Sequence, residues 1–463
     1  MNKDFFSTWS SNMAYMLGYF AADGCMSTRI RNGYITKRVE FTSVDFEHLE
    51  KVSKLLDLGK QPKCYKDGPK SAYTINASCP KMFDDLLLLG MTERKSLTLQ
   101  FPKVPERYIS DFVRGFFDGD GWISCCKTST QAGFVSGSKD FLEKIQAELS
   151  KRDIPTTWNK AKKGNTYSLY VSNVEGLRKL FMFLYSTSNY ETRLNRKYEK
   201  FKSIKRMGCY IIPPLTNLSL MHRGTNRYFC LAHFYLQDSK YREFFLKLDK
   251  TKVFITLDNS AAERSLVTET KLLDIVKELE PNEVISPDIL FDKEKTINSL
   301  LSFIEKMKRL KVRTKIFGCP QGKTKEEWLE CYKFMLARPE VSTIGLSKIS
   351  VPFCWLGASK DEKIKEARQM CVQYLDENEL LFKPIHLLGM GDPTEYRDYN
   401  HIMLRSTDSC YTILAATHGL EFGKNRFKRI ETTNDFYTQK LLGPTKEIVA
   451  KNILFLRRQL GLK

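Results

Sequence analysis

The pattern of apolar and polar residues repeats once within the first half of the chain. Met16-Leu-Gly-Tyr-Phe-Ala-Ala-Asp-Gly returns as Val113-Arg-Gly-Phe-Phe-Asp-Gly-Asp-Gly, which places the acids Asp23 and Asp120 at equivalent positions. A helix that ends in small residues and an acid is an ordinary helix stop when it occurs once, because glycine supplies the positive φ needed there. Two copies at equivalent positions are more specific and indicate an internal duplication.

The segments that follow the two copies are also alike. Residues 41–56 and 134–154 each join a strand-like stretch to apolar residues at helical spacing, and a further strand and helix come after each. We therefore predict two repeats, about 12–105 and 108–205, that form one duplicated αββαββα domain over residues 1–207.

Small residues within the repeated segment have a physical use. Gly18 and Gly115 allow two helices to approach closely, so the ends of these helices would bring Asp23 and Asp120 together on a pseudo-dyad. Two carboxylates there would form an oxygen-rich pocket for a divalent metal. Strands from both repeats would form a basic saddle suited to a DNA groove.

On these residues the segment resembles the monomeric, double-motif LAGLIDADG homing endonucleases. The last acid of each motif holds the metal ions in that family, which implies Mg²⁺ at Asp23 and Asp120. The first copy departs from the motif, because Ala21 stands where its earlier acid would be. Met16 lies too close to the chain start for a splicing block to precede it, so we expect no spliced insert.

Beyond residue 208, short apolar runs typical of strands alternate with amphipathic helical segments. The strand-like runs are 228–236, 253–257, 283–286, 314–318, 343–346, 384–388 and 401–404, and the helical segments include 295–310, 325–337 and 361–375. Strands joined by crossover helices form a parallel sheet, and seven or eight such units predict a TIM barrel over 208–463. A doubly wound open sheet is the alternative, although no GxGxxG motif follows a strand.

The carboxyl ends of barrel strands are where catalytic residues gather. Here they carry three carboxylates, two side-chain amides and several glycines, in the segments Asp258-Asn-Ser, Pro287-Asp288, Pro320-Gln321-Gly322, Gly345-Leu-Ser-Lys, Gly389-Met-Gly391 and Ser406-Thr-Asp408. A single aspartate at such a position is more often a helix N-cap or a loop residue. The ordered series as a whole is more specific.

Taken in their order along the chain, these segments over 225–423 resemble the tRNA-guanine transglycosylase superfamily. The resemblance implies that Asp408, after the glycine turn at 389–391, is the nucleophilic aspartate and that Asp258 is the first catalytic aspartate. It also implies a set of residues that hold a purine-like base: Asp288, Gln321, Gly322, Gly345, Leu346, Gly389 and Gly391.

The tRNA-acting members of that superfamily carry a zinc site built from a Cys-x-Cys-x2-Cys run and a later His. After Asp408 this chain has one Cys, Cys410, and one His, His418, so we expect no zinc, and no cofactor for base exchange. The DNA-acting branch, which places 7-deazaguanines into DNA, fits better beside a DNA-binding module. We predict a DNA-guanine transglycosylase with a covalent aspartyl intermediate, whose partners are double-stranded DNA and a preQ0-like 7-deazaguanine base.

Other functions remain open at this point. A tRNA-guanine transglycosylase would use the N-terminal half to bind RNA. A homing-type DNA endonuclease would carry the barrel as a passenger domain. In a third alternative, the N-terminal half is a binding module without metal.

Composition supports a polyanionic partner and a cytoplasmic protein. The formal net charge is +20, and residues 1–210 hold 34 Lys and Arg against 22 Asp and Glu. No apolar run reaches the length of a membrane span, and the first residues lack the apolar core of a signal peptide. The 12 cysteines have no repeated spacing, which favours reduced thiols. We expect no membrane partner, and the pairing of modules favours a phage protein acting in its bacterial host.

Overall fold

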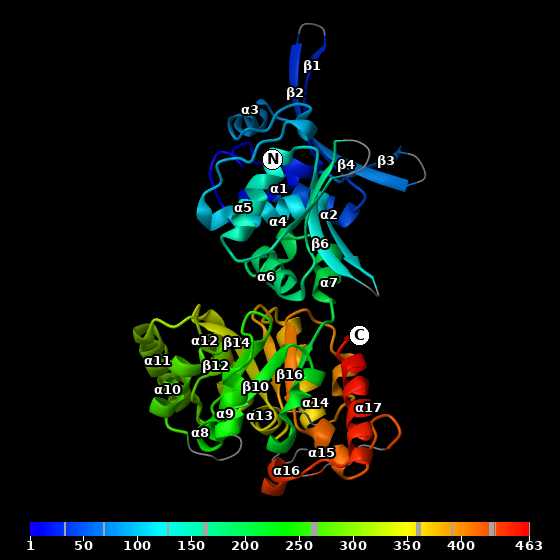
Figure 1. Cartoon of the computed structure of the whole chain (residues 1–463). Helices are drawn as coiled ribbons and strands as arrows, with labels where there is room; N and C mark the ends of the chain where they lie inside the picture. The colour runs from blue at the N-terminus through cyan, green and yellow to red at the C-terminus, as the bar shows by residue number, and fades with distance from the viewer. Residues whose placement is uncertain are drawn as a thin grey trace. The chain divides into compact units, whose positions relative to one another are not determined.

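The computed structural model divides the chain into two compact units, Met1–Ile204 and Lys205–Lys463. It describes residues 1–31, 34–67, 70–126, 129–160, 165–260, 267–357, 363–389, 392–425, 430 and 432–462. Figure 1 shows both units, whose placement relative to each other is not determined.

The first unit contains two copies of one αββαββα arrangement. The first copy comprises α1 (Ser11–Asp23), β1 (Gly24–Arg31), β2 (Tyr34–Ser43), α2 (Phe46–Leu55), β3 (Lys63–Asp67), β4 (Lys70–Ser78) and α3 (Pro80–Leu88). The second comprises α4 (Ile109–Asp120), β5 (Gly121–Cys125), β6 (Thr130–Ser136), α5 (Lys139–Ser150), β7 (Thr157–Lys160), β8 (Tyr167–Val171) and α6 (Val174–Tyr185), and α7 (Asn195–Lys202) follows. Their antiparallel sheets have matching strand orders, β1-β2-β4-β3 and β5-β6-β8-β7. The predicted duplication and its αββαββα order are confirmed.

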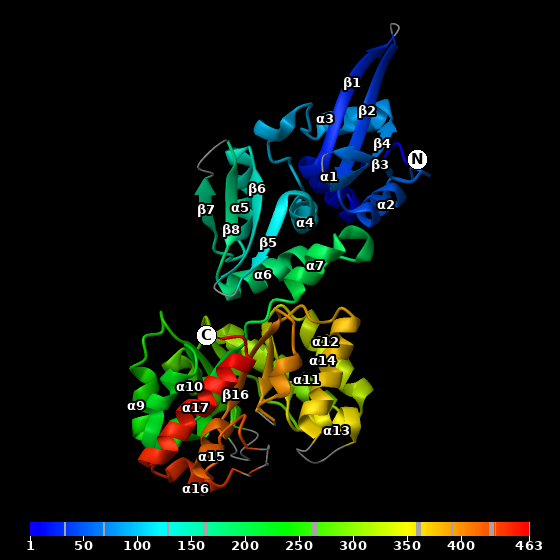
Figure 2. The same ribbon diagram turned by 90° about the vertical axis from the view of Figure 1, so that its right-hand side faces the viewer.

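Helices α1 and α4 pack against each other at the centre of this unit, with one sheet on either side (Figure 2). Glycines make this contact possible: a Cβ at Gly18 would lie 1.9 Å from the carbonyl oxygen of Phe112, and one at Gly115 would lie 2.0 Å from that of Tyr15. The prediction that these two glycines permit close helix approach is therefore confirmed. Both helices are buried along most of their length because they form the shared core of the two repeats.

The second unit is a parallel eight-stranded near-closed barrel surrounded by helices. Its strands are β9 (Gly208–Ile211), β10 (Arg227–Leu231), β11 (Phe254–Asp258), β12 (Glu283–Ile285), β13 (Lys315–Gly318), β14 (Val341–Ser347), β15 (Ile385–Leu388) and β16 (Leu404–Ser409). The hydrogen-bonded order is β10-β11-β12-β13-β14-β15-β16-β9, and β9 lies beside β10. The structure confirms the predicted barrel. It differs from the alternative, a doubly wound open sheet.

The helices of this unit follow the strands in the order expected of a barrel. They are α8 (Ala232–Gln237), α9 (Ser239–Leu246), α10 (Glu269–Leu279), α11 (Lys293–Leu310), α12 (Lys325–Ala337), α13 (Ser350–Leu356), α14 (Ile364–Glu377), α15 (Tyr411–Thr417), α16 (Asn434–Thr438) and α17 (Gly443–Gln459). None of the helices described in either unit is long and apolar enough to cross a membrane.

Three strand assignments made from sequence differ from the structure. Residues 228–236 form a strand only as far as Leu231 and continue as α8, because an apolar run of this kind suits a buried helix as well as a strand. The last strand is 404–409 rather than 401–404, so Asp408 lies within it. The strand 208–211 was not predicted from the sequence, because its apolar run is short and two prolines follow at 213 and 214.

Candidate functional site

A cavity of about 640 Å³, including its solvent-open mouth, lies at the carboxyl ends of the barrel strands. Polar residues reach it from several strands: Asp258, Asn259, Asp288, Ser347, Lys348, Gly389 and Asp408. Apolar walls complete it, provided by Ile212, Phe229, Ile285, Leu290, Cys319, Ile349 and Leu388. Apolar walls with a few convergent polar groups are the usual composition of a site for a small planar ligand.

Asp408 is held in a defined orientation at the floor of this cavity. Its Oδ1 accepts hydrogen bonds from Nε2 of His386 (2.9 Å) and from the backbone N–H of Gly389 (2.8 Å). Gly389 has φ +68°, a conformation that favours glycine and that aims its N–H at the carboxylate. Among the described residues no hydrogen bond goes to Oδ2. The second oxygen is therefore available to a ligand in the cavity.

Electrostatics keeps Asp408 ionised although it is buried. Burial raises its pKa, but the hydrogen bonds from His386 and from the Gly389 N–H, together with the Lys348 ammonium, lower the pKa below the usual range. A buried carboxylate that stays charged at neutral pH is a competent nucleophile or electrostatic partner.

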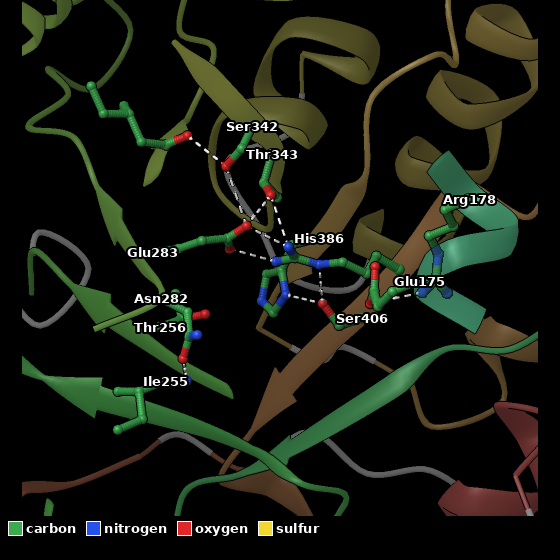
Figure 3. A network of polar contacts seen from close by, with 12 residues as sticks. Glu175, Arg178, Ile255, Thr256, Asn282, Glu283, Ser342, Thr343, His386 and Ser406 are labelled. Atoms are coloured by element: carbon green, nitrogen blue, oxygen red, sulfur yellow. Dashed lines mark hydrogen bonds and ion pairs between the residues drawn. The ribbon is translucent and has the colours of Figure 1, made fainter. Parts of the chain in front are cut away.

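His386, which donates to this carboxylate, also belongs to a polar chain inside the barrel that includes Ser406, Glu283 and Thr343 (Figure 3). Its Nδ1 lies 2.8 Å from Oγ of Ser406, which in turn is 3.4 Å from Nε of Arg405. Arg405 forms hydrogen bonds of 2.5 and 2.8 Å with the two carboxylate oxygens of Glu283. Oγ1 of Thr343 donates to Glu283 at 2.6 Å, which completes a buried network.

Asp288 is braced from two sides at the opposite part of the cavity. Nδ2 of Asn259 donates to its Oδ1 (2.9 Å), and Nε2 of Gln321 donates to its Oδ2 (2.6 Å). Burial raises the pKa of Asp288, and these two hydrogen bonds lower it in part. Gln321 itself is fully buried, and its Oε1 accepts from the backbone N–H of Phe291 at 3.3 Å. Both ends of the Gln321 amide are thus engaged with protein groups.

The other residues singled out from the sequence lie at different depths. Asp258 ends β11, lines the cavity and accepts from the backbone N–H of Ser260 at 2.9 Å. Gly322 packs against the start of α12, where a Cβ would lie 2.5 Å from the backbone N of Trp328. Gly345 and Leu346 are interior to β14 and do not line the cavity. Gly391 lies outside the described residues.

Two cavity-side groups escaped the sequence analysis. Lys348 ends the segment Gly345-Leu-Ser-Lys, and in the structure it lines the cavity with its side chain against Gly389. His386 was part of a predicted strand, and only the alternation of that strand could have indicated that it faces the barrel interior, toward Asp408.

In the first unit, Asp23 and Asp120 stand at the ends of the paired helices α1 and α4. A Cβ at Gly119 would lie 3.3 Å from Oδ2 of Asp23, so this carboxylate packs against the residue that precedes Asp120. Burial and then the charge of Asp120 raise the pKa of Asp23 to about 7, and burial also raises the pKa of Asp120. The two carboxylates repel each other when both are ionised. A divalent cation bound between them would stabilise this doubly ionised form.

Lysines flank both of these helix ends. Nζ of Lys197 donates to the backbone carbonyls of Phe117, Asp118 and Gly119 at 2.7, 2.8 and 2.9 Å. Nζ of Lys95 donates to the carbonyl of Gly24 just after α1. Burial lowers the pKa of Lys197 to about 8. Cations at helix C-termini are stabilised by the helix dipole, and here they also lie near the two acids.

The residues present suit a metal that is completed by substrate. Among the described residues, no cluster of three or more His, Cys, Asp or Glu could hold a metal ion. Two carboxylates are nevertheless sufficient for Mg²⁺, which keeps several waters and takes phosphate oxygens as further ligands. Asp23 and Asp120 would be the protein ligands of such an ion.

Polar side chains lie on the outer faces of the two sheets. In β2 the core residues Val39 and Phe41 alternate with Arg38, and the cross-strand register places Ser78 on the same face as Arg38. In the other sheet Ser124 pairs with Gln131, on the face opposite the buried Ile123. The outer face of each sheet can form hydrogen bonds with a ligand, and the opposite, apolar face packs on the helices.

Comparison with known protein families finds a similarity in both repeats of the first unit. A family model described as a LAGLIDADG-like domain matches residues 10–90 and again 107–183. The first unit is therefore similar to the LAGLIDADG-like domain twice over, and each match covers one of the two repeats.

Two curated proteins from Methanocaldococcus jannaschii are similar to part of the chain. One is an uncharacterized protein, 26% identical over 191 residues, which are 41% of this chain and 63% of that protein. The other is a probable translation initiation factor IF-2, 26% identical over 206 residues, which are 42% of this chain and 16% of that protein. The chain thus spans less than two thirds of the length of either relative.

Solved structures of homing endonucleases are also similar to part of the chain. A K262A mutant of I-SmaMI is 14% identical and matches 42% of this chain and 88% of its own, with a TM-score of 0.30. A variant of I-DmoI, in complex with its nicked target DNA and in the presence of manganese, is 19% identical and matches 41% of this chain and 100% of its own, also with a TM-score of 0.30.

Proposed function

We propose that the barrel exchanges guanine in DNA for a 7-deazaguanine base through a covalent intermediate on Asp408. The observation that carries the proposal is the state of this carboxylate, which is buried, ionised and fixed through Oδ1 while Oδ2 has no protein donor among the described residues. A carboxylate in this state is suited to attack an anomeric carbon, as the nucleophile of a retaining glycosidase does.

Asp288 is suited to recognise the base. Guanine and 7-deazaguanine present two donors on their pairing edge, N1–H and the exocyclic amine, and a carboxylate can accept both. Asn259 and Gln321 fix the orientation of Asp288, so Gln321 acts through Asp288 rather than on the base. The apolar walls at Phe229 and Leu388 would contact the ring faces. That Gly322, Gly345, Leu346 and Gly391 hold the base stays a prediction from the resemblance, and of these the described ones do not line the cavity.

The reaction then needs two displacements at C1′ of the nucleotide. In the first, Oδ2 of Asp408 forms a bond to C1′ while the C1′–N9 bond breaks, and the leaving guanine takes a proton from Asp258. In the second, N9 of the incoming base gives its proton to Asp258 and bonds to C1′, while the carboxylate leaves with its electron pair. Asp258 lines the same cavity and can serve as acid and then as base.

We further propose that the first unit binds double-stranded DNA. The target guanine must leave the base stack to enter the cavity, which costs a few kcal/mol that backbone contacts have to offset. The net charge of +12 over residues 1–210 and the polar outer faces of its sheets supply such contacts.

A second candidate activity is metal-dependent cleavage of DNA by the first unit. Asp23 and Asp120 at the meeting point of α1 and α4 favour it. A bound Mg²⁺ would supply Lewis-acid stabilisation to a phosphate. Asp23 and Asp120 would hold the ion, while Lys95 and Lys197 place positive charge beside it.

Comparison of nucleic acid substrates tests the proposal. Duplex DNA and tRNA are incubated separately with the full chain and isotopically labelled guanine, and incorporation of label is measured. Incorporation into duplex DNA supports the proposal, and incorporation into tRNA alone would assign the protein to the tRNA-acting alternative. Release of nicked DNA without incorporation would favour the endonuclease alternative.

A further inference from the structure

We propose that His386 is a positioning residue for Asp408, which fixes Oδ1 so that Oδ2 attacks C1′ and which stabilises the carboxylate when it leaves in the second displacement. This inference rests on the proposed base exchange. The supporting geometry is the hydrogen bond of 2.9 Å from Nε2 of His386 to Oδ1, beside the Gly389 N–H at 2.8 Å.

The surroundings of His386 fix its tautomer. An ionised Asp408 only accepts hydrogen bonds, so Nε2 carries the proton. Nδ1 then accepts from the hydroxyl of Ser406, and the oxygen of Ser406 remains free to accept from Nε of Arg405. Burial lowers the pKa of His386, which keeps the ring neutral. Each group in the chain therefore donates in one direction, from Arg405 to Asp408.

Aromatic rings hold the imidazole in place. Its ring centroid lies 5.3 Å from that of Tyr210, 5.7 Å from that of Phe229 and 5.5 Å from that of Phe317, and the side chain is fully buried. A histidine packed on these sides cannot rotate away from Asp408 without disturbing the barrel core. It is therefore built to hold one orientation rather than to shuttle a proton to solvent.

Charged and titratable groups approach this pair from each neighbouring strand. Asp408 faces His386 on β15, Lys348 after β14, Cys209 on β9 and Cys410 two residues further along the chain. His386 faces Asp408, Arg405 and Glu283. Since Arg405 and Glu283 pair with each other, the hydrogen bond from His386 is a main influence that lowers the pKa of Asp408.

The hydrogen bond from His386 matters most in the second displacement, when the covalent intermediate breaks down. In the covalent intermediate Oδ2 is bonded to C1′ and Oδ1 is a carbonyl oxygen, which still accepts from His386 and Gly389. When the O–C1′ bond breaks, its electron pair spreads over both oxygens, and the two N–H donors stabilise the charge that forms. Loss of one donor makes the carboxylate a poorer leaving group, so the intermediate should persist.

Substitution of His386 in the full chain tests this role. His386→Leu removes the donor at similar volume, and His386→Gln offers a replacement amide N–H. Tyr210→Phe is the control, because it keeps the ring that packs on His386 and removes only a hydroxyl that contacts Thr256 (2.9 Å) and not Asp408. We expect His386→Leu to slow exchange about 10- to 100-fold, the loss expected for one hydrogen bond to an ionised group. We also expect the acidic limb of the pH–rate profile to move up by about 1 to 2 pH units, and the covalent adduct to accumulate several-fold.

His386→Gln should restore part of the rate and of the pH profile, and Tyr210→Phe should keep the wild-type profile. An unchanged pH profile and adduct level in a folded His386→Leu protein would overturn the proposal. If this variant does not fold, ¹⁵N-histidine NMR of the wild-type chain decides: a neutral Nε2–H ring at pH 6–8 is expected for His386 among the six histidines. An Nδ1–H tautomer or a charged ring would contradict it.

The two proposals can fail separately. Absence of base exchange in the wild-type chain would remove the proposed function. The tautomer of His386 and an NMR titration of the Asp408 carboxyl in wild type and His386→Gln would still show whether the histidine controls this carboxylate.

Discussion

The carboxylate of Glu283 and the guanidinium of Arg405 form a bidentate ion pair inside the barrel, with N–O distances of 2.5 and 2.8 Å. Each residue is about 3% exposed. They lie on strands β12 and β16, which β13, β14 and β15 separate within the sheet, so the pair ties distant strands together.

Glu283→Gln should destabilise the barrel. The substitution leaves Arg405 as a buried charge without its carboxylate, and loss of one partner of a buried pair typically costs about 3–5 kcal/mol. The free energy of unfolding from urea denaturation measures the effect. A double variant, Glu283→Leu with Arg405→Leu, should lose less, because it leaves no unpaired charge. A single variant as stable as wild type would show that the pair does not contribute.

Acid should weaken the same pair. Burial raises the pKa of Glu283, but the charge and hydrogen bonds of Arg405 outweigh it and hold the pKa below its usual range. A depressed carboxyl pKa contributes stability above the pKa of the unfolded chain, and this stability is lost as pH falls through the folded value. The difference in unfolding free energy between wild type and Glu283→Gln should therefore shrink below about pH 4.

Gly18→Ala should strongly destabilise the first unit. The new Cβ would lie 1.9 Å from the carbonyl oxygen of Phe112, so α1 and α4 must separate. Because backbone rather than a flexible side chain has to move, we expect a loss of about 3 kcal/mol or more. Gly443→Ala in α17 is the matched control, since a Cβ at that position would have nothing within 4 Å of it. Thermal unfolding of both variants measures the contrast, and equal midpoints would contradict the close helix contact.

Mg²⁺ should stabilise the first unit more at pH 8 than at pH 6. The pKa of Asp23 is raised to about 7, so without metal the stability that its protonated form contributes is lost as pH rises through 7. A cation that binds the ionised acids offsets this loss at high pH and competes with protons at low pH. The shift in Tm with about 10 mM Mg²⁺ measures the effect, with Ca²⁺ and Na⁺ as comparisons.

Asp23→Asn provides the control for that measurement. It should raise Tm at pH 8 in the absence of metal, because it removes a buried charge beside Asp120, and it should abolish the response to Mg²⁺. Base exchange should persist in the variant, since Asp23 lies in the first unit. A metal response that survives in Asp23→Asn with Asp120→Asn would assign the ion to another site.

Arg29→Ala should weaken duplex binding through the phosphate backbone. Arg29 is exposed on β1 and lies next to Thr28, whose partner across the strands is Lys37. Loss of one phosphate contact reduces the slope of log K against log salt concentration by about 1 and affects all sequences alike. Lys247→Ala, at the end of α9 in the second unit, is the control and should leave the slope unchanged. Equal effects of the two substitutions would contradict DNA binding by this sheet.

Much of the architecture could be predicted from the sequence because its signals were periodic or repeated. The duplicated acid motif, with Gly18 and Gly115 at equivalent positions, predicted both the two repeats and the close packing of their helices. Alternating strands and helices predicted the barrel. The segment 325–337 was predicted as a helix and forms one with these bounds, since its N-cap Thr324 and its two following acids mark a helix start.

The polar network inside the barrel could not be predicted in the same way. His386 and Asp408 are 22 residues apart and meet only because β15 and β16 pair in parallel with an irregular register. Lys348 follows a strand end, where a lysine is usually a solvated residue. The bracing of Asp288 by Asn259 and Gln321 likewise depends on three adjacent strands of the closed sheet, β11, β12 and β13.

Mass spectrometry of nucleosides tests the central claim most directly. Duplex DNA is incubated with the full chain and 7-cyano-7-deazaguanine, digested to nucleosides and analysed, with Asp408→Ala as the matched control. The account predicts a 7-deazaguanine deoxynucleoside, equimolar release of guanine, and neither product with Asp408→Ala. Unmodified DNA with the wild-type chain, or equal modification by Asp408→Ala, would contradict it.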